Sequence, residues 1–205
     1  MVRRLKEYLN NNKFFECYIL NISENDLYYN DLLDVFCGII INPLIINDSN
    51  HTIILSNEIN LDIAQTVDAL TDDLGIDLKV FRSNKIYSNN YDFINVLKKA
   101  YYKYEKIINE NFITIKTLCN TIIEKNIDDL AIIKPILVNK IINDPKLYEI
   151  VNGMFINDLN VCKTANYVYM HRNTINNKLT IIKEETGLDI QKFQEAVILY
   201  ALIKR

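Results

Sequence analysis

The first half of the chain alternates segments with the hydrophobic pattern of strands and segments with that of helices. Short runs rich in β-branched and aromatic residues predict strands, whereas apolar residues at spacings of three and four predict helices. The expected order is strand, helix, strand, strand, helix, strand, helix, at residues 14–22, 25–36, 38–47, 51–56, 60–75, 76–83 and 91–109. This order is typical of a ferredoxin-like βαββαβ unit, so we expect an antiparallel sheet covered on one face by helices.

Individual residues refine this N-terminal pattern. Asn, Asp and Ser at 47–50 predict a hairpin turn, and Pro43 indicates a bulge or an edge position in the strand before it. Gly75 is expected to end the helix at 60–75. The apolar residues expected to face inwards from the last two helices are Ile63, Val67, Leu70, Leu74, Phe93, Leu97, Ala100, Tyr101, Tyr104 and Ile108.

After Asn111 the pattern becomes helical. Helices are expected at 113–126, 144–158, 161–168, 172–185 and 189–205, with a break at Pro135 inside 127–142. Asp144 before Pro145 favours a helix start, Asn160 is an expected N-cap, and Gly187 is a stop signal. Inward positions are expected at Ile115, Leu118, Ile122, Leu147, Ile150 or Val151, Met154, Phe155, Ile175, Leu179, Ile182, Phe193, Val197, Tyr200 and Ile203.

The helices at 161–168 and 172–185 predict a helix-turn-helix. A turn at 169–171 joins them, and small Ala165 lies where they must cross. The second helix would present polar residues outwards at Arg172, Asn173, Asn176, Asn177, Thr180 and Lys183. Arg can bind guanine and Asn can bind adenine, each through two hydrogen bonds, and Thr and Lys can reach phosphate. These residue types favour double-stranded DNA as the partner.

The charge pattern supports this interpretation with one restriction. The chain carries a net charge of -3, yet residues 160–183 contain no Asp or Glu and have four basic side chains. A carboxylate on a DNA-facing surface would be repelled by phosphate. Across 144–205, however, eight Lys or Arg stand against seven Asp or Glu. Because affinity grows with the number of phosphates neutralised, we expect a homodimer to bind rather than a monomer.

Other classes of protein find little support in the sequence. No apolar run is long enough to cross a membrane, and the N-terminus lacks the apolar core of a secretory signal. The four cysteines are scattered, which favours reduced thiols in the cytoplasm. No glycine-rich phosphate loop is present, His51 has no second ligand at metal-binding spacing, and Asp68, Asp72 and Asp73 suit a solvated helix face. We therefore expect no enzyme activity, metal site or cofactor.

The run KTANYVYMHRNTINNKLTIIKEETGLDI resembles the C-terminal helix-turn-helix of the PucR/CdaR family of bacterial transcriptional regulators. HRNT followed at the right distance by EETGLD carries the resemblance, and Tyr169 separates it from the Fis-type motif, which usually has Gly there. Asn177 and Lys178 depart from the Tyr-Arg pair usual in the family. The resemblance extends to the preceding region, since family members often have a degenerate, non-catalytic GGDEF-like domain there.

This resemblance implies an α+β chain with two domains. Residues 1–112 would form the GGDEF-like domain for dimerisation or sensing, and 113–205 an all-α domain with its core motif at 160–186. The expected DNA-binding residues are Lys163, Thr164, His171, Arg172, Asn173, Thr174, Asn176, Asn177, Lys178 and Lys183.

Within that set, Arg172, Asn173 and Asn176 are expected to read bases from the major groove. Lys163, Thr174, Lys178 and Lys183 are expected to hold phosphates, and His171 either contacts phosphate or caps the second helix. A small-molecule effector is a further expected partner, although this chain starts almost directly at the GGDEF-like region, without the usual sensor domain. The alternative hypothesis is a protein-interaction or ligand-sensing module with little DNA affinity.

Overall fold

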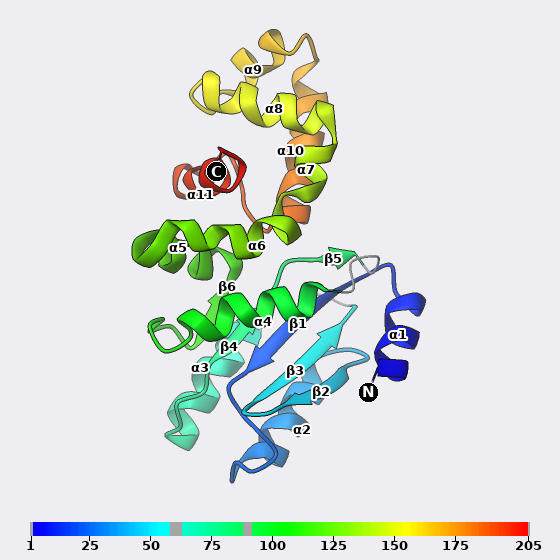
Figure 1. Cartoon of the computed structure of the whole chain (residues 1–205), viewed down its shortest axis with the longest axis vertical. Helices are drawn as coiled ribbons and strands as arrows, with labels where there is room; N and C mark the ends of the chain where they lie inside the picture. Colours follow the sequence, from blue (N-terminus) through cyan, green and yellow to red (C-terminus); the bar gives the residue numbers. More distant parts are fainter. Residues whose placement is uncertain (1, 58–62, 88–91, 205) are drawn as a thin grey trace. The chain divides into compact units, whose positions relative to one another are not determined.

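The computed structural model describes residues 2–57, 63–87 and 92–204, with backbone only for residues 2–4. The chain divides into two compact units, Met1–Thr114 and Ile115–Arg205. The first contains a sheet with helices and the second is helical (Figure 1). The α+β class predicted from the sequence is therefore confirmed.

The N-terminal unit is built on a sheet in the order β2-β3-β1-β4-β6, with β5 also paired to β1. The strands are β1 (Phe14–Leu20), β2 (Leu44–Asp48), β3 (His51–Ser56), β4 (Val80–Arg82), β5 (Ile86–Tyr87) and β6 (Phe112–Thr114). All pairings are antiparallel except β4 with β6. Strand β3 lies between β1 and β2, the split βαβ arrangement that the sequence predicted.

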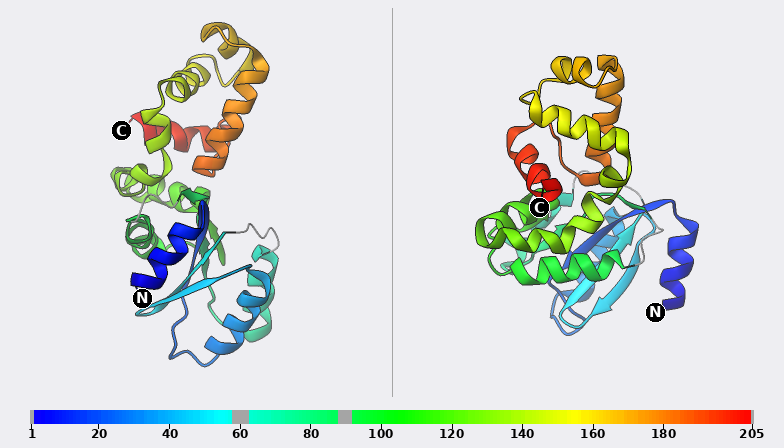
Figure 2. Two further views of the ribbon diagram at one scale, coloured as in Figure 1. Left: turned by 90° about the vertical axis from the view of Figure 1, so that its right-hand side faces the viewer. Right: turned by 45° about the horizontal axis from the view of Figure 1, so that its top comes forward.

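Helices cover both faces of this sheet, whereas the sequence led us to expect one. The helices are α1 (Val2–Asn11), α2 (Tyr29–Ile39), α3 (Ile63–Leu74) and α4 (Phe93–Tyr104). Helices α2 and α3 pack on the face that holds Tyr18 and Ile54. Helix α4 packs on the opposite face, where the Phe93 ring lies 4.7 Å from that of Phe15 (Figure 2). Helices lie on both faces of the sheet because the side chains of β1 are buried on both faces.

Side chains of the β2–β3 hairpin tie it to α4. His51 Nε2 lies 2.7 Å from a carboxylate oxygen of Glu105, and its ring stacks on Tyr102 at 4.0 Å. The Tyr102 hydroxyl donates to Asp48 at 2.8 Å, and Lys98 lies 2.6 Å from the same carboxylate. His51 therefore belongs to a packing network. Within the described chain, no three His, Cys, Asp or Glu side chains are placed to hold a metal ion.

Several boundaries in this unit differ from those predicted. Strand β2 begins directly after Pro43 and lies at the sheet edge, where a missing backbone N–H costs no ladder bond. The helix expected at 25–36 begins at Tyr29, because residues 23–26 form a turn closed by Asp26. The strand expected at 76–83 is shortened to β4. Residues 60–62 and 91, where two helices were expected to begin, lie outside the described residues.

The second unit consists of α5 (Ile115–Asn126), η1 (Ile127–Asp129), α6 (Leu130–Leu137), α7 (Asn139–Asn143), α8 (Pro145–Ile156), α9 (Val161–Tyr167), α10 (Arg172–Thr186) and α11 (Phe193–Lys204). Pro135 does not break the chain as predicted; it lies inside α6, and the interruption comes at Val138. A helix tolerates proline by giving up one hydrogen bond, and the neighbouring Ile133 and Leu137 are fully buried.

Candidate nucleic-acid interface

The start of α8 follows the sequence prediction. The Asp144 carboxylate accepts hydrogen bonds from the backbone N–H groups of Lys146 and Leu147, at 2.9 and 3.2 Å, and Pro145 occupies the first turn. This cap satisfies two of the N–H groups that a helix start leaves without partners. The inward face of α8 is therefore fixed, with Leu147 and Met154 buried.

Helix α8 supports α9 through a close crossing at Gly153. A Cβ atom built on Gly153 would lie 3.1 Å from Thr164 Cγ2, 3.3 Å from Tyr167 Cδ1 and 3.3 Å from Val168 Cγ1. A side chain at this position would require its neighbours to shift by a few tenths of an ångström. Ala165, the small residue predicted to lie where the two helices of the motif cross, is buried.

The two helices of the motif are each capped by a side chain. Asn160 Oδ1 accepts from the Lys163 N–H at 3.0 Å and begins α9. His171 Nδ1 accepts from the Asn173 N–H at 3.2 Å and begins α10. Between them Tyr169 has a positive φ of 54°, a conformation that costs roughly 1–2 kcal/mol in a residue with a Cβ. The turn predicted at 169–171 is therefore present and has a defined geometry.

Helix α10 packs against the rest of the helical unit through a narrow stripe of buried apolar side chains. Ile175, Leu179 and Ile182 are buried, as the spacing predicted. Gly187 adopts a positive φ of 72° and closes the helix by donating to the Lys183 carbonyl at 2.8 Å. The stripe occupies one side of the helix, and the other side faces solvent until the last turn, where Glu185 and Thr186 are also buried.

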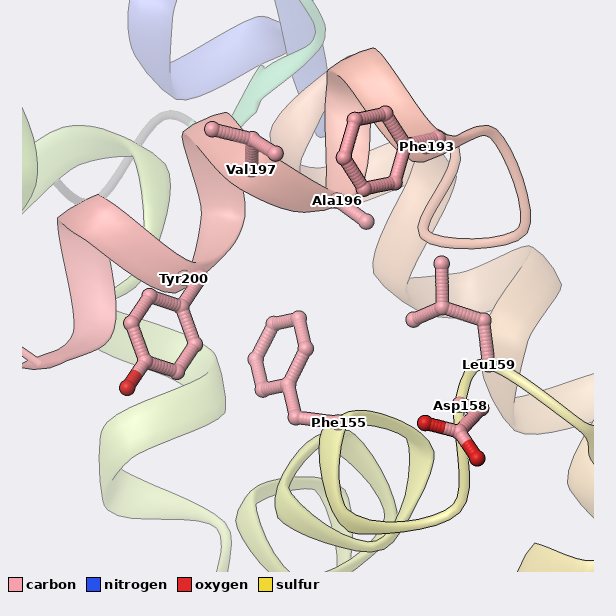
Figure 3. A pocket seen from close by; sticks show the side chains of 7 residues that line it. All are labelled: Phe155, Asp158, Leu159, Phe193, Ala196, Val197 and Tyr200. Atoms are coloured by element: carbon pink, nitrogen blue, oxygen red, sulfur yellow. The ribbon is translucent and has the colours of Figure 1, made fainter.

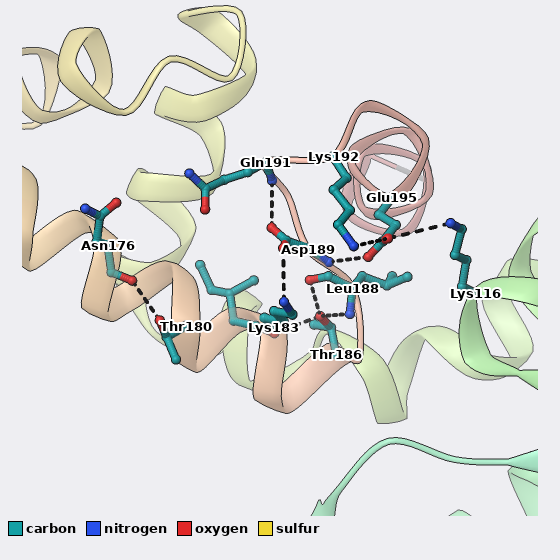
Figure 4. Close-up of polar contacts among 11 residues, drawn as sticks. Lys116, Asn176, Thr180, Lys183, Thr186, Leu188, Asp189, Gln191, Lys192 and Glu195 are labelled. Atoms are coloured by element: carbon teal, nitrogen blue, oxygen red, sulfur yellow. Dashed lines mark hydrogen bonds and ion pairs between the residues drawn. The ribbon is translucent and has the colours of Figure 1, made fainter. Parts of the chain in front are cut away.

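A polar network fixes the chain after α10 (Figure 4). The Asp189 carboxylate accepts from the Gln191 N–H at 3.1 Å and from Lys183 Nζ at 3.1 Å. Partial burial alone would raise the pKa of Asp189, but these two donors lower it below its usual value. The Asp189 N–H in turn donates to the buried Glu195 carboxylate at 2.7 Å. The end of α10 is therefore anchored to the start of α11.

Most of the predicted DNA-binding side chains lie on the solvent side of this motif. The exposed ones are Lys163, His171, Arg172, Asn173, Thr174, Asn176, Asn177 and Lys183, and Lys178 is half-buried. Glu184, the first exposed carboxylate after the run, lies about 18 Å along α10 from Arg172 at 1.5 Å per residue. The N-terminal part of α10 thus combines exposed basic and amide groups with the positive end of a helix dipole.

One of the predicted residues is buried, and another is already engaged in an ion pair. Thr164 is fully buried, because it faces α8 at the Gly153 crossing, so it cannot reach DNA from this position. The Lys183 ammonium is already paired with Asp189. The sequence prediction had treated Thr164 as a contact because it belongs to the motif, and a motif position does not distinguish a packing residue from a surface residue.

Exposed aromatic groups in this region were missed as candidates. Tyr169 is 96% exposed and Tyr167 is 51% exposed. On α11, Phe193, Val197 and Tyr200 are also exposed, although we expected them to pack inwards. Helix α11 is apolar on several sides, so periodicity did not identify its buried face. The side chains that pack inwards are Ala196, Ile198, Leu199, Leu202 and Ile203.

Two helices joined by a tight turn, with a polar outer face that has no carboxylate from Asn160 to Lys183, define a helix-turn-helix domain. Residues 147–204 match the family model described as the PucR C-terminal helix-turn-helix domain. The helical unit therefore contains a domain of the PucR type, which supports a transcriptional regulator. Thus the resemblance found in the sequence is confirmed for this part of the chain.

Among solved structures, the chain is similar to the crystal structure of Regulator of Polyketide Synthase Expression from Bifidobacterium adolescentis. The two share 15% identity with a TM-score of 0.42, over 99% of this chain and 84% of that chain. No curated protein matches the chain. Within the described residues, each helix is too short or too polar to cross a lipid bilayer.

Proposed function

We propose that the chain is a sequence-specific DNA-binding transcriptional regulator whose helix α10 enters the major groove. The observation that carries this proposal is the exposed surface of α9 and of α10 as far as Lys183, which has no carboxylate and lies within a domain of the PucR helix-turn-helix type. An α-helix fits the major groove, where each base pair presents a distinct pattern of donors and acceptors. The proposal includes no enzymatic activity.

The proposed contacts follow the position of each side chain. Arg172, Asn173 and Asn176, in the first turns of α10, would contact base edges, and Asn177 would contribute beside them. The phosphate contacts would come from Lys163, His171, Thr174 and Lys178. Lys183 would contribute less, because binding phosphate requires its ion pair with Asp189 to open. Thr164 is left out because it is buried.

The regulator would bind as a homodimer. The surface of one copy offers few cations, and each phosphate neutralised adds to affinity. Two copies double the contacts and place two recognition helices in successive major grooves, about 34 Å apart. The N-terminal unit, with its ferredoxin-like order, would act as a non-catalytic GGDEF-like domain that senses a signal or adds to dimerisation. A small-molecule effector would act through that unit.

The test begins with DNA fragments selected from the source genome by the full-length protein. Fluorescence anisotropy on a selected fragment then compares Arg172→Ala with Lys125→Ala, which removes an equal charge from an exposed position at the end of α5. Arg172→Ala should lose roughly 5- to 150-fold in affinity, about 1–3 kcal/mol. The Lys125 variant should change affinity less than about twofold, since a surface charge away from the contact adds little.

The salt dependence separates this function from its rival. A DNA-binding protein must lose affinity steeply as salt rises, because binding releases counterions. An Arg172→Ala protein that binds the fragment as tightly as the wild type would show that α10 is not the recognition helix. No binding even at low salt would favour a protein-interaction module, which the departures at Asn177 and Lys178 and the exposed aromatic residues of α11 also motivate.

A further inference from the structure

Helix α11 carries an apolar stripe on the side away from its buried face. Phe193, Val197 and Tyr200 follow one another at helical spacing and are 76%, 43% and 50% exposed. Three large apolar side chains in a row on one exposed helix face are uncommon in a chain that functions as a monomer. We therefore infer that the stripe packs against the surface of a partner.

The stripe borders a hollow shared with the end of α8. Phe155 and Leu159 line it from the α8 side, and the Phe155 ring meets the Tyr200 ring edge to face at 5.1 Å. The hollow has a volume of about 440 Å³, and side chains from both segments point toward it (Figure 3). We call this surface the α8–α11 groove, defined by Phe155, Asp158, Leu159, Phe193, Val197 and Tyr200.

The groove carries a projection beside a recess. Phe193, at the start of α11, is the most exposed apolar side chain of the groove, and it lines the hollow together with Phe155 and Leu159. A surface with both features side by side can match a second copy of itself related by a two-fold axis. In such a contact each Phe193 enters the hollow of the other copy, since two-fold interfaces are self-complementary.

The charges around the groove also favour a second copy of this chain as the partner. Asp158 contributes the groove's carboxylate. Lys192 directly precedes Phe193; its side chain is 64% exposed, and its Nζ lies 3.6 Å from a carboxylate oxygen of Glu195. When Phe193 enters the partner's hollow, Lys192 is brought toward the partner's Asp158, and the reverse contact forms by symmetry. A nucleic acid or an anionic lipid surface would instead meet the Asp158 carboxylate and be repelled.

The size of the patch fits a modest dimer. An aromatic side chain presents roughly 150–250 Å², so the exposed fractions of the stripe correspond to roughly 300 Å² of apolar surface in each copy. Two copies with their polar rims would bury on the order of 1,000 Å², near the lower limit of specific interfaces. A contact of that size gives a weak dimer in free solution. Binding of the two copies to neighbouring DNA half-sites would strengthen it.

We propose that the α8–α11 groove is a two-fold interface between two copies of this chain, with Phe193 as its central side chain. This deepens the proposed function, because it places the dimer contact beside the recognition helices. It does not require DNA, so it can be tested on the free protein.

The test is sedimentation velocity of the full-length chain over a concentration series, without DNA. Phe193→Glu would place a carboxylate next to the partner's Asp158, and we expect the dimer dissociation constant to rise at least tenfold. Ile142→Glu is the matched control, because Ile142 is 42% exposed on α7 and lies outside the groove. It should change the dissociation constant less than about twofold.

Thermal unfolding of dilute, monomeric protein completes the experiment. Since Phe193 is mostly exposed, Phe193→Glu should leave the midpoint of the helical unit unchanged. A large fall in that midpoint would overturn the proposal, because it would mean that the groove is packed within its own chain. A wild-type protein that stays monomeric throughout the series, or a Phe193→Glu protein that dimerises like the wild type, would also overturn it. Each of these results leaves DNA binding to be judged separately by anisotropy on a single half-site.

Discussion

The crossing of α8 and α9 at Gly153 makes a sharp prediction about stability. Replacing Gly153 by Ala puts a methyl group 3.1–3.3 Å from three side-chain carbons of α9 and the residue after it. The same change at Gly38, inside α2, puts the methyl group where nothing lies within 4 Å. Both variants therefore gain in helix propensity, but they differ in packing.

The expected changes in the free energy of unfolding follow from helix propensity and from packing. Ala is better than Gly in a helix interior by about 1 kcal/mol, which sets the gain at Gly38, with less realised because Gly38 is close to the helix end. At Gly153 the methyl group overpacks a closed site, and such insertions typically cost about 1–3 kcal/mol. Thr164 and Val168 are buried and cannot move aside, whereas Tyr167 is half exposed and can. We expect a net loss of about 1 kcal/mol.

The measurement must report on each unit separately. The chain has 13 Tyr and no Trp, so urea unfolding can be followed by circular dichroism and tyrosine fluorescence. Hydrogen exchange on peptides from α2 and from α8–α9 assigns each change to its unit. Gly38→Ala should slow exchange in α2, and Gly153→Ala should speed it in α8–α9. If Gly153→Ala stabilised its helices as Gly38→Ala does, the close crossing would be refuted.

Two further predictions concern the ends of α10. Tyr169→Gly removes the strain of a positive φ, so the helical unit should gain roughly 0.5–1 kcal/mol, measured as a higher urea midpoint; no gain would mean that the turn is unstrained. The pKa of Asp189 is lowered in the folded protein by Gln191 and Lys183, despite partial burial that raises it. Its stabilising effect is thus present above the ordinary pKa of 3.8 and is lost as pH falls through the lower folded value. Asp189→Asn should flatten this part of the stability–pH curve, and an unchanged curve would contradict the assignment.

Local signals in the sequence predicted much of the helical unit. Asp144 before Pro145, Asn160 and Gly187 each act through hydrogen bonds or backbone angles within a few residues, so their effect can be read without knowing the fold. The buried stripe of α10 was predicted for the same reason, since its outer face is uniformly polar. These signals sufficed to find the helix-turn-helix and most of its exposed residues.

Features set by distant contacts could not be predicted. Helix α11 is apolar on several sides, and only the positions of the surrounding helices decide that Leu199 is buried and Phe193 exposed. Thr164 is buried because α8 approaches at a glycine, which the sequence of α9 does not reveal. The short strands β5 and β6 have few residues, so their pairing with β1 and β4 depends on the sheet that is already there.

The cap on α10 has a chemical consequence for the proposed DNA contact. Most caps use an oxygen, but here His171 Nδ1 accepts the Asn173 N–H, and a nitrogen that accepts cannot also carry a proton. The neutral ring therefore exists as the tautomer protonated at Nε2, with a single N–H left to donate. The group that begins α10, the proposed recognition helix, thus also fixes which atom of the imidazole could offer a proton to a DNA phosphate.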